Sequence, residues 1–299
     1  MIISLIKYND RMVIAFVGWL MTVRKISSNS VSQYLSGLRI VHLKNGVLPG
    51  NLRPDLINAI LKGHSRIETV QKSPRLAMTI PVMKLLKKLL TISSMSLEKK
   101  RLLWTICCMA FHGSFRIHEL LSKEELTFDH TTTLLGADVR KISTCIESQA
   151  ENLLIVHLKN PKEDKLRLGV NVELFSTGTF SCPVSAWTKW RNAATCKITA
   201  TKPVFRHGDG KCMTGYTFNK EIKCLLGKFI DYDKGKFLSH SFRAGFASMM
   251  ASAGYSDPEI MRQGRWHSQA FATYCKTGRG SRLKEQREIA RNLTKLYDK

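Results

Sequence analysis

The sequence predicts a mainly α-helical protein of two domains that carries a small antiparallel β-sheet. Apolar residues recur at helical spacing through most of the chain, and one segment instead alternates apolar and polar residues around a polar turn. A polar stretch with two prolines, residues 67–81, separates two helical regions and is interpreted as a linker. The length of 299 residues suits about two domains. We therefore expect a first domain over residues 1–73 and a second over residues 74–299.

The first domain should contain three helices. The first is the apolar run 12–21, which is too short to span a bilayer and has no cleavage site after it, so no signal peptide is expected. The second follows the N-cap cluster "SSNS" at 27–30 and closes at Gly46. The third covers residues 52–66. Its inward-facing residues should be Leu56, Ile57, Ile60 and Leu61.

The second domain should be helical apart from one hairpin. Helical patterns cover residues 82–90, 99–123, 183–194, 216–230, 240–254 and 256–264, with a charged terminal helix at 281–296. Residues 152–174 alternate before and after "KNPKED", and Leu166 and Leu168 belong to the returning strand in this interpretation. Asp257 should be the N-cap of the helix 256–264, with Pro258 at its first position.

The charge of the chain indicates a polyanionic partner. Lys and Arg number 47 against 23 Asp and Glu, which gives a formal net charge of +24 and an isoelectric point of about 9.9. Each phosphate that such a surface neutralises releases counterions, so nucleic acid is favoured over a membrane surface. The basic residues are spread along the chain, which indicates basic surfaces on folded domains rather than a tail.

The eight cysteines argue against a zinc site. No C-x-x-C pair exists, and two of the cysteines are adjacent within an apolar helical run. Reduced, mostly buried thiols of a cytosolic or nuclear protein fit this pattern best.

Two stretches of the second domain place cations in conspicuous settings. "FHGSFRIHELL" (111–121) has Arg116 directly after a Gly–Ser turn, at the start of a helix that also bears Glu119. The tip of the hairpin offers three lysines, Lys159, Lys162 and Lys165. Each has an ordinary explanation, because arginines at helix starts and lysines on turns are commonly just solvated.

Two further stretches lie near the end of the chain. "HSFRAG" (240–245) puts His240 and Arg243 on one helix face, because positions i and i+3 are neighbours there. "GRWHSQAFATYCK" (264–276) puts Tyr274 ten residues beyond Gly264. Taken alone, the histidine would be structural and the tyrosine a core or contact residue.

In this order the residues resemble the motif set of the tyrosine recombinases, the phage-integrase-like site-specific DNA recombinases. The resemblance covers nearly the whole chain and rests on Arg116, Lys162, His240, Arg243 and Tyr274. "ELTFDHTTTLLGADV", "CPVSA" and "HSFRAGFASMMASAG" also resemble the recombinases of eukaryotic DIRS- and Crypton-type mobile elements. The resemblance implies a helical, SAM-like core-binding domain that binds DNA over 1–73, and a catalytic domain with the DNA breaking–rejoining fold over 74–299.

It also implies a function: cleavage and rejoining of DNA through a covalent 3′-phosphotyrosyl intermediate, for integration or excision of a mobile element. Tyr274 would be the nucleophile, and Arg116 and Arg243 would clamp the phosphate oxygens. His240 would take or return the tyrosine proton. Lys162 would protonate the leaving oxygen, with Lys159 as the alternative. No metal, cofactor or ATP is expected.

The position of a second histidine departs from the family. There a His or Trp often follows the glycine directly, whereas this chain has Gly264, Arg265, Trp266 and His267. Counting from glycine to tyrosine puts Arg265 in that position. An N–H donor that packs against the site would instead be Trp266 or His267, and Trp266 is our choice.

The expected partners are double-stranded recombination sites and further copies of the chain: a dimer on a site and a tetramer in synapsis, held by the C-terminal segment around 281–296. A solvated terminal helix is the alternative for that segment. No membrane partner is expected, and the location would be nuclear for a eukaryotic protein and otherwise cytoplasmic. The alternative functions are a type IB topoisomerase-like enzyme, a catalytically inactive DNA-binding relative and a metal-dependent DDE transposase.

Overall fold

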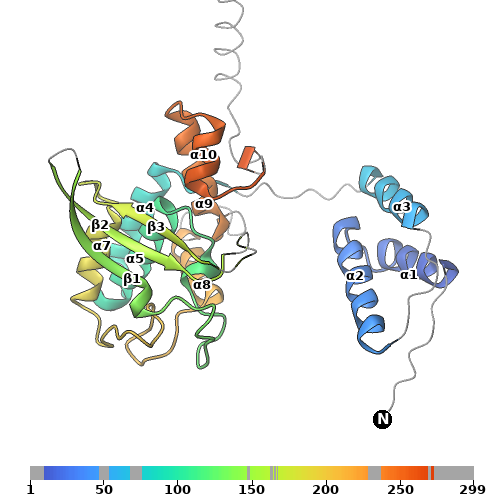
Figure 1. Ribbon diagram of the computed structural model, residues 1–299, viewed down its shortest axis with the longest axis horizontal. Helices are drawn as coiled ribbons and strands as arrows, with labels where there is room; N and C mark the ends of the chain where they lie inside the picture. Colours follow the sequence, from blue (N-terminus) through green and yellow to red (C-terminus); the bar gives the residue numbers. More distant parts are fainter. Residues whose placement is uncertain are drawn as a thin grey trace, which may run out of the picture. The chain divides into compact units, whose positions relative to one another are not determined.

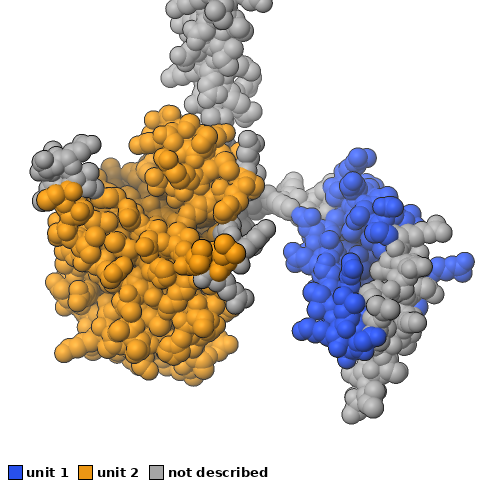
Figure 2. Space-filling view, in the orientation of Figure 1, with its two compact units in different colours: residues 1–72 blue, residues 73–299 orange. Residues whose placement is uncertain are grey.

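The computed structural model describes residues 10–46, 54–67, 76–146, 149–161, 164, 166, 168–227, 237–268 and 271–272. The chain divides into two compact units, residues 1–72 and residues 73–299 (Figure 2). Each unit is described by itself. Within the described ranges, every helix is too short or too polar to cross a membrane.

In its described residues, unit 1 contains three helices, α1 (Asp10–Thr22), α2 (Ser28–Lys44) and α3 (Pro54–Ile67) (Figure 1). Its buried core comprises Val13, Val17, Leu20, Met21, Val31 and Ile57. The Ser27 side chain accepts a hydrogen bond from the Ser30 N–H and so caps α2. The expectation for Leu56 is wrong, because this residue is 41% exposed while Ile57 faces the core. Neighbours on a helix point about 100° apart, and here Leu56 lies outside the face that Ile57 presents to the core.

Unit 2 contains seven α-helices in its described residues. They are α4 (Ile80–Ile92), α5 (Leu97–His112), α6 (Ile117–Leu120), α7 (Pro183–Arg191), α8 (Gly215–Leu226), α9 (His240–Ser252) and α10 (Asp257–Gly264). The second half of α5 is buried all round, from Thr105 to Phe111, so this helix runs through the core. It packs against α7 and α9.

The sheet of unit 2 is antiparallel, with strands in the order β1 (Val139–Ile146), β2 (Gln149–Leu158) and β3 (Val170–Phe175). The predicted hairpin is confirmed as β2 and β3, with Leu158 opposite Val170. Its connection is longer than expected: Leu166 and Leu168 lie in it and are 78% and 77% exposed. The Asp164 carboxylate accepts the Gly169 N–H at 2.7 Å, which closes the turn before β3 begins.

α9 and α10 lie side by side at one end of unit 2 (Figure 1). A small cluster joins them, with Phe246, Met250, Ile260 and Phe271 among its buried members. The N-cap of α10 is Ser256 rather than the expected Asp257, since Ser256 and Glu259 form a capping box. The seven cysteines of the described residues are free thiols.

Candidate functional site

A tight turn between α5 and α6 is the base of the candidate site. Gly113 and Ser114 form it, and Ser114 has a positive φ of 46°. A Cβ on Gly113 would lie 2.2 Å from the ring of Phe115, so the glycine is required by the ring that folds back over it. The turn sets Arg116 at the start of α6, as the sequence predicted.

Arg116 is tied to Glu119 by two hydrogen bonds. Its backbone N–H donates to Glu119 Oε2 at 2.9 Å, and its guanidinium Nη1 donates to Glu119 Oε1 at 3.1 Å. Both side chains are largely buried, at 14% and 5% exposure. Sequence reasoning had noted Glu119 without giving it a role; its spacing of three residues from a helix start was the signal.

Arg243, on the first turn of α9, reaches the same turn from a distant part of the chain. It is 3% exposed, donates from Nη1 to the Ser114 carbonyl, and donates from Nη2 to the Arg265 carbonyl at 3.2 Å. Its guanidinium lies 4.1 Å from the centre of the Trp266 ring. The structure therefore brings Arg116 and Arg243 to one short turn.

Arg265 is a third arginine at this turn. Its Nη1 donates to the Gly113 carbonyl at 2.8 Å, and its Nη2 donates to the Ser114 carbonyl at 3.3 Å and to Glu119 Oε2 at 3.1 Å. The residue has a left-handed backbone, with φ 54° and ψ 52°. Its guanidinium is thus directed at protein oxygens.

Trp266 is the candidate that packs within the site. Besides Arg243 it contacts Phe271, with ring centroids 5.9 Å apart. A Cβ on Gly264 would lie 1.5 Å from the Trp266 ring, so this glycine makes room for the indole. His267, the other candidate donor, is exposed.

His240 is the first residue of α9 and is half-buried, one helical turn from Arg243. The start of this helix is well held. The Ser239 N–H donates to Asn219 Oδ1 at 2.9 Å, and the Ser241 carbonyl accepts the Met78 N–H at 2.8 Å. Tyr274, Lys162 and Lys165, like the terminal segment 281–296, lie outside the described residues.

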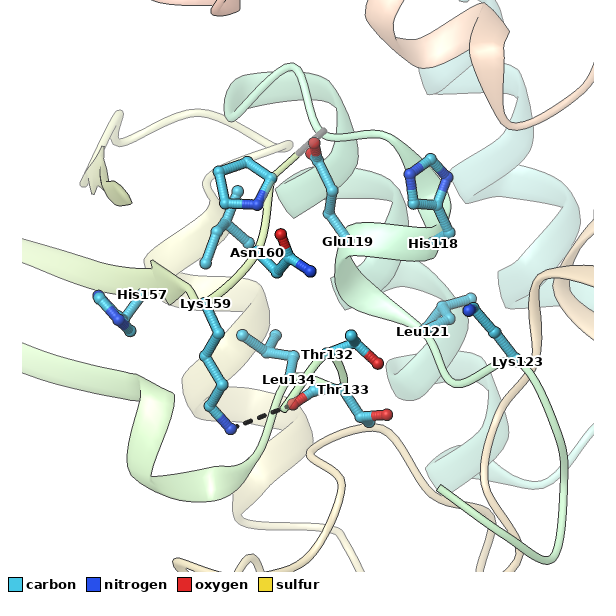
Figure 3. Close-up of a pocket in the computed structure, with 12 residues that line it drawn as sticks. His118, Glu119, Leu121, Lys123, Thr132, Thr133, Leu134, His157, Lys159 and Asn160 are labelled. Atoms are coloured by element: carbon cyan, nitrogen blue, oxygen red, sulfur yellow. Dashed lines mark hydrogen bonds between the residues drawn. The ribbon is translucent and has the colours of Figure 1, made fainter. Parts of the chain in front are cut away.

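Lys159 points away from the arginines. Its Nζ forms an ion pair with Asp138 Oδ2 at 2.8 Å and donates to the carbonyls of His130 and Thr133 at 3.0 and 3.3 Å. Figure 3 shows its side chain extended toward Thr133, with Glu119 on the other side of the pocket. Asp138 was not singled out from the sequence.

The pocket in Figure 3 has a volume of about 190 Å³. Glu119 lines it from α6, and Lys159 to Pro161 line it from the segment that leaves β2. The connection that carries Lys162 therefore begins at a cavity wall that faces the carboxylate bound to Arg116.

Comparison with known proteins identifies the fold. No protein-family model and no curated protein matches the sequence. Among solved structures, the chain is similar to the XerH site-specific recombinase in a post-cleavage complex with palindromic difH substrate. The identity is 14% over 95% of this chain and 70% of XerH, with a TM-score of 0.57. It is also similar to the Tn1549 transposon integrase in complex with circular intermediate DNA, at 13% identity over 93% of this chain and 83% of the integrase, with a TM-score of 0.52. The chain therefore has the fold of tyrosine recombinase catalytic domains, mainly helical with a small antiparallel sheet.

Proposed function

We propose that this chain is a site-specific DNA recombinase that cuts and rejoins strands through a tyrosine–phosphate ester. One observation carries the proposal: Arg116 and Arg243, distant in sequence, are held at one turn, Arg116 by the Glu119 carboxylate and Arg243 by the Ser114 carbonyl. Two guanidinium groups fixed in this way suit the non-bridging oxygens of a phosphodiester, since each is planar, always charged and able to donate twice. The likeness to recombinases solved with DNA and the net charge of +24 support the same substrate.

In the proposed reaction, every bond broken and every proton moved is accounted for by the DNA and the protein's own side chains, without a cofactor. The Tyr274 oxygen attacks the scissile phosphorus in line, the bond from phosphorus to the 5′-oxygen breaks, and a 3′-phosphotyrosyl ester forms. His240 accepts the tyrosine proton, and Lys162 supplies the proton that leaves with the 5′-hydroxyl. Attack by the 5′-hydroxyl of a partner strand on the ester reverses these steps. The roles of Tyr274 and Lys162 rest on sequence order alone.

Trp266 would hold the Arg243 guanidinium in place through its indole ring. An indole face over a guanidinium at 4.1 Å fixes the plane of that guanidinium by cation–π attraction. This supports the choice of Trp266 over His267, which is exposed.

We further propose the finer assignments that the resemblance suggests. The natural substrate would be the ends of a mobile element of DIRS or Crypton type, and unit 1 would bind DNA together with unit 2. Four copies would assemble in synapsis through the C-terminal segment. A type IB topoisomerase-like activity is the second candidate, because the same cations and nucleophile would serve it. Relaxation of supercoiled plasmid without joining of two duplexes would favour that alternative.

The test is to trap the covalent intermediate without knowing the target sequence. A library of random-sequence duplexes, each nicked so that cleavage releases a short 5′-hydroxyl fragment, is incubated with the full chain in EDTA. We expect a protein–DNA adduct that survives denaturation, and sequencing its DNA reports the site. Tyr274→Phe should give no adduct, and the matched variant Tyr255→Phe, at a tyrosine 52% exposed on the surface, should give it as wild type does. An adduct that persists in Tyr274→Phe refutes the nucleophile, and one that needs a divalent metal refutes the mechanism.

A further inference from the structure

We infer that Arg265 is a positioning residue that fixes Arg116 and Arg243 relative to each other. The inference rests on the proposed recombinase function and concerns the residue that directly follows Gly264, the position at which the resembled family often has His or Trp. In this chain that position has a different use. It ties together the three segments on which the clamp is built.

The contacts of Arg265 show how the link is made. On one side, Arg265 Nη2 and Arg116 Nη1 donate to the two oxygens of the same Glu119 carboxylate. On the other side, the Arg265 carbonyl accepts from Arg243 Nη2. The Ser114 carbonyl accepts from both Arg243 and Arg265. Every connection between the two clamping arginines that is described above thus passes through Arg265, Glu119 or Ser114.

The backbone of Arg265 supports a selected role rather than an accidental contact. A left-handed conformation is unfavourable for a residue that is not glycine or asparagine. It ends α10 and turns the side chain back onto the turn, with the guanidinium 5.0 Å from the centre of the Phe115 ring. The side chain is only 14% exposed. Its two terminal nitrogens donate to the Gly113 carbonyl and to Glu119 from one rigid plane, whereas a lysine would have to reach both from a single nitrogen.

Catalysis should slow when Arg265 is lost, because a preorganised site tolerates only small displacements of its clamping groups. Clamping groups have to stay within about 0.5 Å of their productive positions, and loss of one such donor typically costs about 10²–10³ in rate. Without the Arg265 side chain, Glu119 still binds Arg116 but is no longer linked to the Gly113–Ser114 turn. The carbonyl of residue 265, which accepts from Arg243, is then no longer held in place by that side chain. We expect the chemical step to slow by about 10²-fold, with DNA affinity nearly unchanged.

The variants separate the side chain from the backbone. Arg265→Asn tolerates the left-handed conformation and is too short to reach Glu119, whereas Arg265→Lys keeps the charge without the bridge. Arg262→Asn, an exposed arginine on the same helix, is the matched control. Single-turnover adduct formation on a duplex selected by the wild-type protein gives a rate constant and an amplitude. Poor folding lowers the amplitude, whereas a misplaced clamp lowers the rate constant.

We expect the rate constant to fall about 10²-fold in Arg265→Asn and at least tenfold in Arg265→Lys, with wild-type amplitude and with Arg262→Asn unaffected. Glu119→Gln combined with Arg265→Asn should be no more than about threefold slower than the slower single variant, because both act through one network. If the fold-reductions of the two single variants multiply in the double variant, Arg265 contacts the phosphate directly. If the rate constant of Arg265→Asn is unchanged, Arg265 does not position the clamp. Either result overturns the inference. Failure of the proposed function is distinct, since the wild-type protein would then form no adduct.

Discussion

Gly245 offers a test in which helix propensity and packing predict opposite signs. It lies within α9, the helix that carries His240 and Arg243, at a point where the segment before α4 crosses closely. A Cβ at this position would lie 2.1 Å from the Met78 carbonyl oxygen and 2.8 Å from its carbon. Met78 is fully buried and its N–H bonds to the Ser241 carbonyl, so neither backbone has room to yield.

The balance for Gly245→Ala can be worked from these contacts. Alanine in a helix interior gains about 1 kcal/mol over glycine. Ordinary contact distances require the two backbones to separate by about 1 Å or more, and overpacking of this kind costs about 1–3 kcal/mol. Loss of the hydrogen bond from Met78 to Ser241 adds about 0.5–1.5 kcal/mol. The net expectation is a loss of about 0.5–3.5 kcal/mol, together with a displaced Arg243 and an adduct rate lower by about 10²-fold.

Urea denaturation followed by tryptophan fluorescence measures this loss, since four of the five tryptophans belong to unit 2. The matched variant is Gly37→Ala in α2, where the added Cβ meets nothing within 4 Å. It should stabilise unit 1 by up to about 1 kcal/mol. If Gly245→Ala proves as stable as the wild-type protein, or more stable, the close crossing of α9 with the segment before α4 is wrong.

Three further predictions concern the surroundings of the clamp. Trp266→Ala should slow adduct formation roughly tenfold while Trp266→Phe retains most of the rate, because the aromatic face over Arg243 is what acts; equal rates in both variants contradict this. Burial lowers the pKa of His112 below its ordinary 6.5, so the unfolded chain takes up the proton first and stability should fall as the pH drops below 6.5. Urea denaturation at pH 7.5 and 5.5 should show a smaller fall in His112→Gln. Lys159→Met should slow adduct formation, whereas Lys159→Arg should keep nearly the wild-type rate, because arginine retains the ion pair with Asp138. If Lys159→Arg is as slow as Lys159→Met, Lys159 is the proton donor.

The fold could be predicted where burial leaves a periodic pattern. β2 alternates buried Leu154, Val156 and Leu158 with outward residues, and this alternation identified the hairpin. β1 was missed because most of its residues are exposed and only its pairing with β2 defines it as a strand. The return to β3 was predicted too early, since Leu166 and Leu168 alternate in a connection whose turn is closed by Asp164.

Residue type and order in the sequence singled out members of the candidate site, but they did not predict the hydrogen bonds between them. A turn before Arg116 and the spacing of His240 and Arg243 are local features, and they located two sides of the site. The direction of the Arg265 side chain depends on a left-handed backbone that no local rule assigns to arginine, so counting placed the residue without revealing its contacts.

The charged side chains buried around this turn explain why it is suited to bind an anion. Around the turn described here, Arg116, Arg243 and Arg265 bring three positive charges and Glu119 one negative charge, all at 14% exposure or less. Desolvated charge is costly unless it is compensated, and backbone carbonyls compensate it only in part. Under the proposed function, a phosphodiester would bring negative charge to this turn, and the charge that develops in its transition state would bring more. The arginines would then interact more strongly with the reacting phosphate than with the bound substrate, which is the condition for catalysis rather than mere binding.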